Sequence, residues 1–455
     1  MDKMKCFLGK KALFVIVALL LCNSVSRGQE VLRLSLEKAL EIAQSENPTI
    51  KVADKEIEKK QYAKKGVIAG LFPNINASGG YTYTIKKQVF AMMGQSIKVG
   101  QSNNWNAGLS LSLPIFAPTL TKSIELSAKD IELAVESARS SKQDLVNQVT
   151  KAYYQLLLAQ DSYEVLKKSY AHSEANYEVV NNKFKQGVVS EYDKIRAEVQ
   201  VRNLKPSVIS AENAVNLTKL QLKVLIGLDA NQNMEIEGNL ANYENSMYAE
   251  ALNVDTTMID NNTQLRQMKL QSEMLDKQLQ VNKSAYLPSV SLSSQFSYVS
   301  MNEDFKFGNY KWNPYSTVGL SLSIPIFDGN ARSYKVKQTK LQMEQLTLNK
   351  LNLRRSLDVQ VKNYMDNIQK SIEQVGSNKE SVKQAEKGCL IAQKRYEVGK
   401  GTILELNDSE LALTQSKLSY NQSIFDYLSA KADLEKVLGK DRILSSSQKN
   451  EELKK

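Results

Sequence analysis

The chain has very few of the residues on which most metal and catalytic sites depend. Its 455 residues include one histidine, His172, and three cysteines, of which Cys6 and Cys22 lie near the N-terminus. A typical zinc site takes several histidine or cysteine ligands, and a Ser–His or Cys–His pair needs a histidine beside its nucleophile. The composition therefore predicts that the protein is not an enzyme and needs no metal or other cofactor.

Proline and long apolar runs are scarce as well. The chain has 8 prolines, most of them at the ends of expected strands or helices, so long stretches are free to be helical. Beyond Gly28 no run of about 18 apolar residues occurs, so we expect no transmembrane helix. No segment mixes dense lysine and arginine with aromatic residues, which argues against a nucleic-acid partner.

Residues 1–28 have the composition of a secretory signal peptide. Lysines precede an apolar run from Ala12 to Leu21 that is too short to span a bilayer, and small residues follow it. We expect cleavage near Gln29. Cys22 leaves a lipoprotein as the alternative, but the leucine before it is too large for a good acylation signal.

Removal of the signal peptide changes two further expectations. It takes away five Lys/Arg and one Asp, so the net charge falls from +11 to +7. It also leaves Cys389 as the only cysteine, so no intrachain disulfide is expected.

The sequence contains an internal repeat. The segment Leu-Ser-Leu-Ser-Leu-Pro-Ile-Phe at 109–116 recurs as Leu-Ser-Leu-Ser-Ile-Pro-Ile-Phe at 320–327. The segment Phe-Lys-Gln-Gly at 184–187 matches Tyr-Glu-Val-Gly at 396–399. We therefore divide a mature chain of 29–440 into two tandem copies of one module, at about 34–227 and 262–439. Residues 228–261 are interpreted as an equatorial insertion and 441–455 as a flexible tail.

Each copy contains two segments in which apolar and polar residues alternate. They cover about 75–85 and 105–115 in the first copy, and 290–298 and 318–326 in the second. Strands of roughly ten residues are long enough to cross a bilayer when tilted. A soluble β-sandwich is the alternative, but the strand length, the signal peptide and aromatic residues near the strand ends favour a membrane sheet. The expected girdle residues at the loop ends are Tyr81, Tyr83, Trp105, Tyr298 and Trp312.

The rest of each copy is expected to be helical. Apolar residues recur at alternating steps of four and three from about 121 to 184, which predicts a coiled-coil helix of roughly 96 Å. A return helix follows over about 190–225, and a shorter helix precedes the first strand. The two shorter helices together nearly equal the long one, so we expect them to stack end to end beside it.

Four strands cannot close a membrane barrel by themselves, because about eight are needed and open sheet edges do not persist in lipid. A dimer would give about eight strands around a filled interior, whereas a trimer would give about twelve around a pore. A transport role favours the trimer. The predicted fold class is therefore mainly α with a membrane β part: a long coiled-coil α-helical barrel plus four transmembrane strands per protomer, forming a shared 12-strand β-barrel.

Several motifs together resemble the TolC-like outer membrane efflux proteins. They are the repeated strand ending in Pro-Ile-Phe, the Phe/Tyr-x-x-Gly tips, and Leu-Ser-Leu-x-x-Ala-Leu-x-x-Ala beginning at Leu34. The resemblance implies a homotrimer in outer membrane lipid that extends into the periplasm. It also implies a periplasmic adaptor protein and an inner-membrane transporter of the RND or ABC type as partners, in a tripartite efflux pump or a type I secretion system.

The resemblance also assigns roles to residues at the two helical tips. Adaptor docking falls on Gly187, Ser190, Gly399 and Thr402, and the constricting acidic ring of the periplasmic gate falls on Glu405 and Asp408. The alternative for those two carboxylates is that they are only solvated or complement the helix dipole.

A tip lock is the remaining assignment from the resemblance. Asp193 and Tyr396 match two of the residues of the family's lock, but glycine stands at position 401, where the family has arginine. Closure is therefore expected to be weaker here or made differently.

A periplasmic adaptor is the main alternative function, because adaptors also have a signal peptide and a coiled-coil hairpin. An adaptor would carry one hairpin flanked by lipoyl-like β segments. The two tandem hairpins and the amphipathic strands favour the exit duct.

Overall fold

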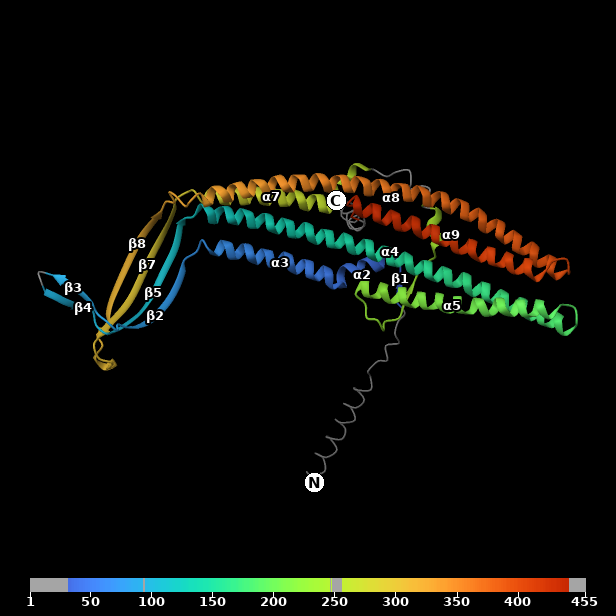
Figure 1. The fold of residues 1–455 in the computed structure, drawn as a ribbon, viewed down its shortest axis with the longest axis horizontal. Helices are drawn as coiled ribbons and strands as arrows, with labels where there is room; N and C mark the ends of the chain where they lie inside the picture. Colours follow the sequence, from blue (N-terminus) through green and yellow to red (C-terminus); the bar gives the residue numbers. More distant parts are fainter. Residues whose placement is uncertain (1–31, 93–94, 246, 248–255, 442–455) are drawn as a thin grey trace, which may run out of the picture. The chain divides into compact units, whose positions relative to one another are not determined.

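The computed structural model describes residues 32–92, 95–245, 247 and 256–441 (Figure 1). The expected signal peptide, residues 442–455 and part of the expected insertion lie outside these ranges. The chain divides into two compact units. Of the described residues, we call 48–92, 95–144, 256–365 and 433–441 the strand unit, and 32–47, 145–245, 247 and 366–432 the tip unit.

Helices make up most of the described chain, and they occur in the order that the repeat predicts. The helices are α2 (Leu36–Glu46), α3 (Pro48–Ala69), α4 (Pro118–Lys185), α5 (Glu191–Ile226), α7 (Thr263–Ser284), α8 (Ala331–Glu397) and α9 (Ile403–Val437), with 3-10 turns η1 (Leu240–Tyr243), η2 (Thr256–Asn261) and η3 (Phe307–Asn309).

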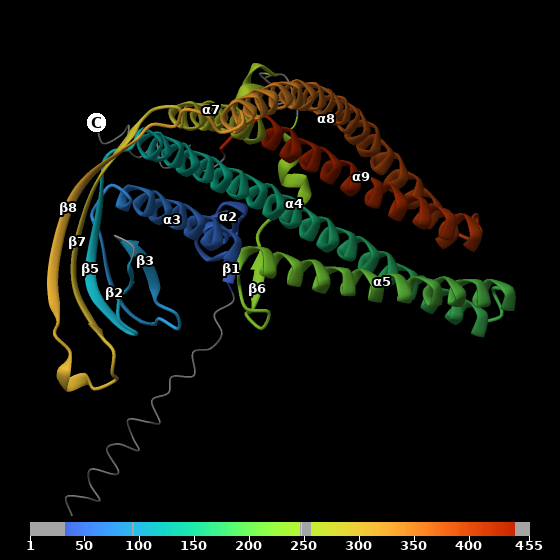
Figure 2. The same cartoon turned by 60° about the vertical axis from the view of Figure 1, so that its left-hand side comes forward.

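The strand unit contains one four-stranded antiparallel sheet (Figures 1 and 2). Its strands are β2 (Asn74–Tyr83), β5 (Asn103–Phe116), β7 (Ser289–Asn302) and β8 (Asn313–Ser323), in that spatial order. The two copies of the repeat therefore join side by side, through β5 of the first copy and β7 of the second. The sheet confirms the four predicted strands, although β5 and β7 are each 14 residues long rather than about ten.

The register places most apolar residues of the four strands on one face. Leu109 lies opposite Ala77 on one side and Phe296 on the other, and Leu292 lies opposite Leu320. Serine, asparagine and glycine pair on the other face, as Ser110 does with Asn76. Because a slip of one residue would mix the two faces, the sequence alternation fixes this register.

The outer strands of this sheet each have one edge that no other described strand pairs with. β2 pairs with β5 alone and β8 with β7 alone. The apolar face is also uncovered within the single chain, where Val318 is 75% exposed and Leu320 68%. Both features suit a sheet whose neighbours are lipid and further strands.

Two small β elements were not predicted from the sequence. A hairpin of β3 (Gln88–Met92) and β4 (Gln95–Val99) lies in the connection between β2 and β5. In the tip unit β1 (Leu32–Leu34) pairs in parallel with β6 (Met234–Ile236), so the start of the described chain is held by the expected insertion.

Helix boundaries follow local signals that the sequence displays. Ser35 is the N-cap of α2, and its hydroxyl accepts a hydrogen bond from the Lys38 N–H. Asn47 ends that helix before Pro48 begins α3. The predicted coiled-coil seam of α4 is buried at some positions, such as Val149, and half-buried at most others, and Val135 on the seam is 49% exposed. No helix in the described ranges is both long and apolar enough to cross a membrane.

Each copy joins the end of its return helix to a capping asparagine. In the tip unit the Asn47 amide donates to the Leu225 carbonyl, and in the strand unit the Asn262 amide donates to the Val437 carbonyl, which is the matching contact of the second copy. In the strand unit, Asp441 follows the end of α9 closely and adds further contacts there. Its carboxylate accepts hydrogen bonds from Arg139 and Gln143 of α4.

Candidate functional site

The two helical tips have the same backbone closure. At the end of α4, the Val188 N–H donates to the Lys183 carbonyl and Gly187 has a φ of 72°. At the end of α8, the Lys400 N–H donates to the Arg395 carbonyl and Gly399 has the same φ of 72°. This left-handed conformation favours glycine, so the two glycines identified from the sequence permit the turns.

The helices that leave the two tips begin with different caps. Ser190 and Asp193 form a reciprocal capping box at the start of α5, with the Asp193 carboxylate accepting from the Ser190 hydroxyl at 2.7 Å. At the start of α9, Thr402 accepts from the Glu405 N–H through its hydroxyl at 3.2 Å. Ser190 and Thr402 therefore fix where the returning helices begin, and Asp193 is engaged within its own tip.

Gly401 is required by close backbone approach rather than by its φ. A Cβ at position 401 would lie 3.1 Å from the Arg395 Cβ and 3.1 Å from the Tyr396 nitrogen. The Gly401 N–H also donates to the Arg395 carbonyl at 3.0 Å. The second tip folds so closely against the end of α8 that a side chain at position 401 would require its neighbours to shift by a few tenths of an ångström.

Side chains from both tips form one small core in the tip unit. Val180 and Ala197 come from the first tip, and Tyr396, Ile403 and Leu406 come from the second. All five are at most 9% exposed. The Lys183 ammonium lies 4.5 Å from the centre of the Tyr396 ring, which adds a cation–π contact between the tips. The two hairpins are therefore held together close to their ends by apolar packing around Tyr396.

The predicted lock residues lie near each other, but no hydrogen bond joins them. The Tyr396 hydroxyl is buried and has no hydrogen-bond partner in the described part of the chain. Burial, and to a lesser extent the negative charge of Asp193, raise the pKa of Tyr396. Tyr396 therefore links the tips through its ring, while its hydroxyl remains unsatisfied.

The two carboxylates of the expected acidic ring have different surroundings. Arg395 Nη2 lies 3.6 Å from a Glu405 carboxylate oxygen, so Glu405 has a cation beside it. Asp408 is exposed and makes no ion pair or hydrogen bond with any residue in the ranges that the structure describes. Sequence reasoning had not identified Arg395, because the contact joins the last turn of one helix to the first turn of the next.

The expected girdle aromatics of the strand unit lie at the loop end of the sheet. Tyr81 and Trp105 are opposite each other on β2 and β5, with ring centres 4.4 Å apart. Tyr83 and Tyr298 lie on the same face of the sheet, and Trp312 directly precedes β8. Two further aromatics that the sequence analysis missed, Phe305 and Phe307, pack against Trp105 from the β7–β8 connection.

A family model described as outer membrane efflux protein matches residues 39–228 and 256–440, which is most of the chain. The chain belongs to the outer membrane efflux protein family. The match leaves residues 229–255 uncovered, and these lie within the segment interpreted as an insertion.

Known relatives agree with this membership. The outer membrane protein TolC of Escherichia coli is 24% identical, with 94% of this chain and 86% of that protein covered. TolC of Vibrio cholerae is 20% identical over 82% of this chain and 83% of its own length. Among solved structures, the CmeC outer membrane channel of Campylobacter jejuni superposes with a TM-score of 0.71 at 18% identity, covering 91% of this chain and 89% of that one.

Family membership settles the general function. The protein is an outer-membrane exit duct that extends into the periplasm, and such ducts work with adaptor proteins and inner-membrane transporters. This decides between the two functions considered from the sequence, in favour of the duct and against the periplasmic adaptor. The resemblance stated from the sequence and the predicted fold class, apart from the trimer, are confirmed.

Proposed function

We propose that three copies of this chain assemble into one continuous duct, with a 12-strand barrel in the outer membrane. The observation that carries the proposal is the four-stranded sheet with its apolar face uncovered and its outer edges unpaired by any described strand. Neighbouring strands of the sheet all run antiparallel, so β2 and β8 point in opposite directions. β8 of one copy can therefore pair antiparallel with β2 of the next, and the barrel closes with every pair antiparallel.

The duct passes substrates delivered by an inner-membrane transporter across the periplasm and the outer membrane. Two relatives carry names from different transport classes: a toluene efflux pump outer membrane protein of Pseudomonas putida and the alkaline protease secretion protein AprF of Pseudomonas aeruginosa. Both the RND-type pump and the ABC-type exporter are therefore consistent with this chain as its energy-supplying partner.

The tips are the proposed docking site for the periplasmic adaptor. Gly187, Ser190, Gly399 and Thr402 shape the two turns, and apolar side chains stand out beside them: Val188 and Val398 are each 68% exposed. Apolar side chains at the end of a helical hairpin favour contact with another helical hairpin over contact with water.

The second tip is the proposed periplasmic gate. Three copies would bring Glu405 and Asp408 from each chain around one axis, where their charges favour cations and repel one another. The ion pair with Arg395 partly offsets Glu405 within each chain, so Asp408 is the stronger contributor to the field.

Cysteine cross-linking tests the assembly directly. In a Cys389→Ser background, Asn76→Cys on β2 is combined with single cysteines along β8, from Ser316 to Ser321. Oxidation is expected to give covalent trimers at the positions where the two edges meet. Ser110→Cys on the interior strand β5 is the matched control and should give none.

Cell fractionation provides the second test. The wild-type protein should appear in the outer membrane as an oligomer that dissociates on heating. Release with the soluble periplasm, or failure of every β2–β8 cysteine pair to cross-link, would contradict the trimeric duct.

A further inference from the structure

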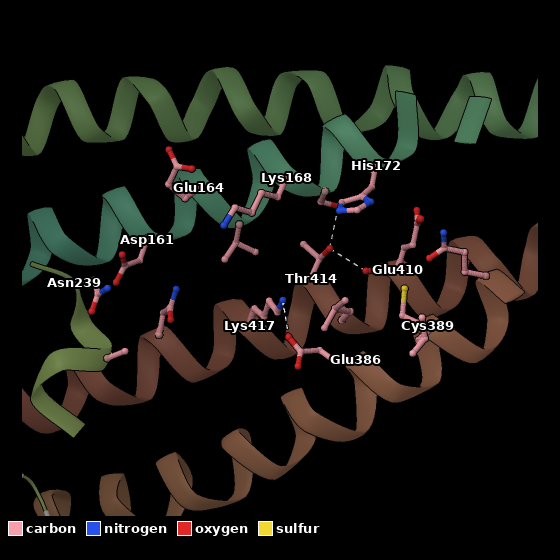
Figure 3. A pocket seen from close by; sticks show the side chains of 17 residues that line it. Asp161, Glu164, Lys168, His172, Asn239, Glu386, Cys389, Glu410, Thr414 and Lys417 are labelled. Carbon is pink, nitrogen blue, oxygen red and sulfur yellow. Dashed lines mark hydrogen bonds and ion pairs between the residues drawn. The ribbon is translucent and has the colours of Figure 1, made fainter. Parts of the chain in front are cut away.

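The tip unit contains a cleft of about 480 Å³ between its two helical hairpins. Figure 3 shows Asp161, Lys168 and His172 of α4 along one side and Glu410, Thr414 and Lys417 of α9 along the other. α8 closes the lower side, and Asn239 of the connection after β6 closes one end. The volume falls within the range of roughly 300–1,000 Å³ that is usual for small-molecule pockets.

The charges that face this cleft are unbalanced. Asp161, Glu164 and Glu410 line it without an ion pair to any described lysine or arginine. Of the two lysines in the lining, Lys417 is already paired with Glu386 at 2.8 Å. Lys168 is the one lysine left to oppose these three carboxylates, and His172 is the other basic group in the lining, so carboxylates outnumber basic groups around the cleft.

Glu410 is the best-placed of these carboxylates to hold a ligand. Its side chain points from α9 toward α4, where it accepts hydrogen bonds from Asn176 and, at 3.5 Å, from Ser173. These two neutral donors orient the carboxylate without supplying a cation. Burial raises the pKa of Glu410, because it disfavours the charged form of the carboxyl group. A positively charged amine bound in the cleft would compensate the negative charge of the Glu410 carboxylate.

Apolar side chains complete the lining. Val165, Leu390 and Leu413 face the cleft from three different helices, and Leu390 is 53% exposed. A ligand that matches both the carboxylates and the apolar side chains of this lining carries a positive charge at one end and an apolar group at the other.

We propose that this cleft binds an amphipathic organic cation, with the ammonium against Glu410 and the apolar body between Val165, Leu390 and Leu413. The site lies beside the tip core rather than at the acidic gate, and it goes beyond the role of the duct as a passage. An anion would meet three unpaired carboxylates, and a neutral apolar molecule would leave Glu410 without a counter-ion.

Cys389 provides a built-in reporter, because it lines the cleft and is the only cysteine after Cys22. The experiment follows the rate at which a maleimide modifies Cys389 in the purified full-length protein, located by mass spectrometry. The probe is 2-(1-naphthyl)ethylamine, which is cationic at neutral pH. Its neutral match in size and shape is 2-(1-naphthyl)ethanol.

The amine is expected to slow the modification of Cys389 in a saturable way, and the alcohol is expected to leave the rate almost unchanged. Glu410→Gln should weaken the protection about tenfold, because it removes a charge-assisted contact. Glu198→Gln is the matched control: it occupies the equivalent position of α5 in the first copy of the repeat, outside the cleft and paired with Arg202. Glu164→Gln, at the exposed rim, should weaken protection less and serves if Glu410→Gln fails to fold.

Three results would overturn the proposal. Equal protection by the amine and the alcohol would show that charge plays no part. Unchanged protection in both Glu410→Gln and Glu164→Gln would place the amine elsewhere. Equal loss of protection in Glu410→Gln and Glu198→Gln would show that Glu410 has no specific part in binding the amine.

Discussion

Arg395 Nη2 lies 3.6 Å from a carboxylate oxygen of Glu405, across the turn of the second helical tip. Both side chains are about half exposed, so the pair contributes little to stability. The pair instead changes the electrostatic field at the tip. The guanidinium offsets the negative charge of Glu405, one of the two carboxylates of the proposed acidic gate, but not that of Asp408. Position 401, where the resemblance implies arginine, is glycine here, and a guanidinium reaches the tip from the last turn of α8.

Ion selectivity should therefore respond unequally to substitutions at the gate. Asp408→Asn is expected to lower cation selectivity in single-channel recordings more than Glu405→Gln does, and the double variant should lower it most. Arg395→Gln should raise the cation selectivity, because the negative charge of Glu405 is then no longer offset by the guanidinium. Unchanged selectivity in the double variant would remove the acidic-gate assignment.

Gly401→Ala should loosen the second tip. The new Cβ would lie 3.1 Å from Arg395 Cβ and the Tyr396 nitrogen, so the turn must shift at a cost of about 1–3 kcal/mol. We expect faster proteolysis between α8 and α9 and a lower melting temperature. Gly388→Ala is the control: it lies within α8 with nothing within 4 Å of the added Cβ, and it should stabilise the helix by about 0.5–1 kcal/mol. A Gly401→Ala variant as resistant to proteolysis as Gly388→Ala would show that the turn tolerates a side chain.

Tyr396 should hold the tips closed through its ring and not through its hydroxyl. Because the hydroxyl is buried without a partner among the described residues, Tyr396→Phe is expected to keep the closed-state conductance and to leave stability the same or slightly higher. Tyr396→Ala removes the ring between Val180 and Ile403 and should raise basal conductance. If Tyr396→Phe opens the duct as far as Tyr396→Ala does, a hydroxyl bond to Asp193 is the lock.

Local patterns in the sequence predicted the long helices, the four strands of the sheet and the two helical tips. The alternation of apolar residues located four strands, and glycines at 187 and 399 marked both tips. These signals work because they depend on residues close together in the chain. Because the chain contains an internal repeat, each of these patterns occurs in both copies, and the two copies predict the same order of elements.

Several features that sequence reasoning missed depend on contacts between distant segments. The β1–β6 pair joins Leu32–Leu34 to Met234–Ile236, and Glu410 meets Asn176 across an equally long stretch of chain. The β3–β4 hairpin was missed for another reason, because its strands are only five residues each and lie in a connection treated as loop. Nothing in the sequence indicated that Cys389 and His172 line the same cleft.

Glu244 should stabilise the tip unit at neutral pH and lose that effect in acid. It is buried, and it accepts hydrogen bonds from Lys379 and Tyr420. Burial alone would raise the pKa of Glu244, but the two hydrogen bonds outweigh it and lower the pKa. A carboxyl with a lowered folded-state pKa contributes stability above its unfolded pKa, and that contribution disappears as pH falls through the folded value.

Glu244→Gln should therefore lower the melting temperature at pH 7 and have little effect near pH 3. Hydrogen exchange of the peptide 240–245 gives a local measurement of the same effect. A difference between variant and wild type that stays constant from pH 7 to pH 3 would show that the charge of Glu244 is irrelevant.

Glu410 should show the opposite dependence on pH. Burial raises its pKa, with smaller lowering contributions from Asn176, His172 and Ser173. A carboxyl with a raised folded-state pKa costs stability when it is charged in both states, and this cost is relieved as pH falls through the folded pKa. Glu410→Gln should therefore raise the melting temperature at pH 7, and the difference should shrink as pH approaches 4. Glu198→Gln, on α5, should not raise the melting temperature at either pH. A Glu410→Gln variant that is less stable at pH 7 would mean that the hydrogen bonds to α4 outweigh the cost of the buried charge.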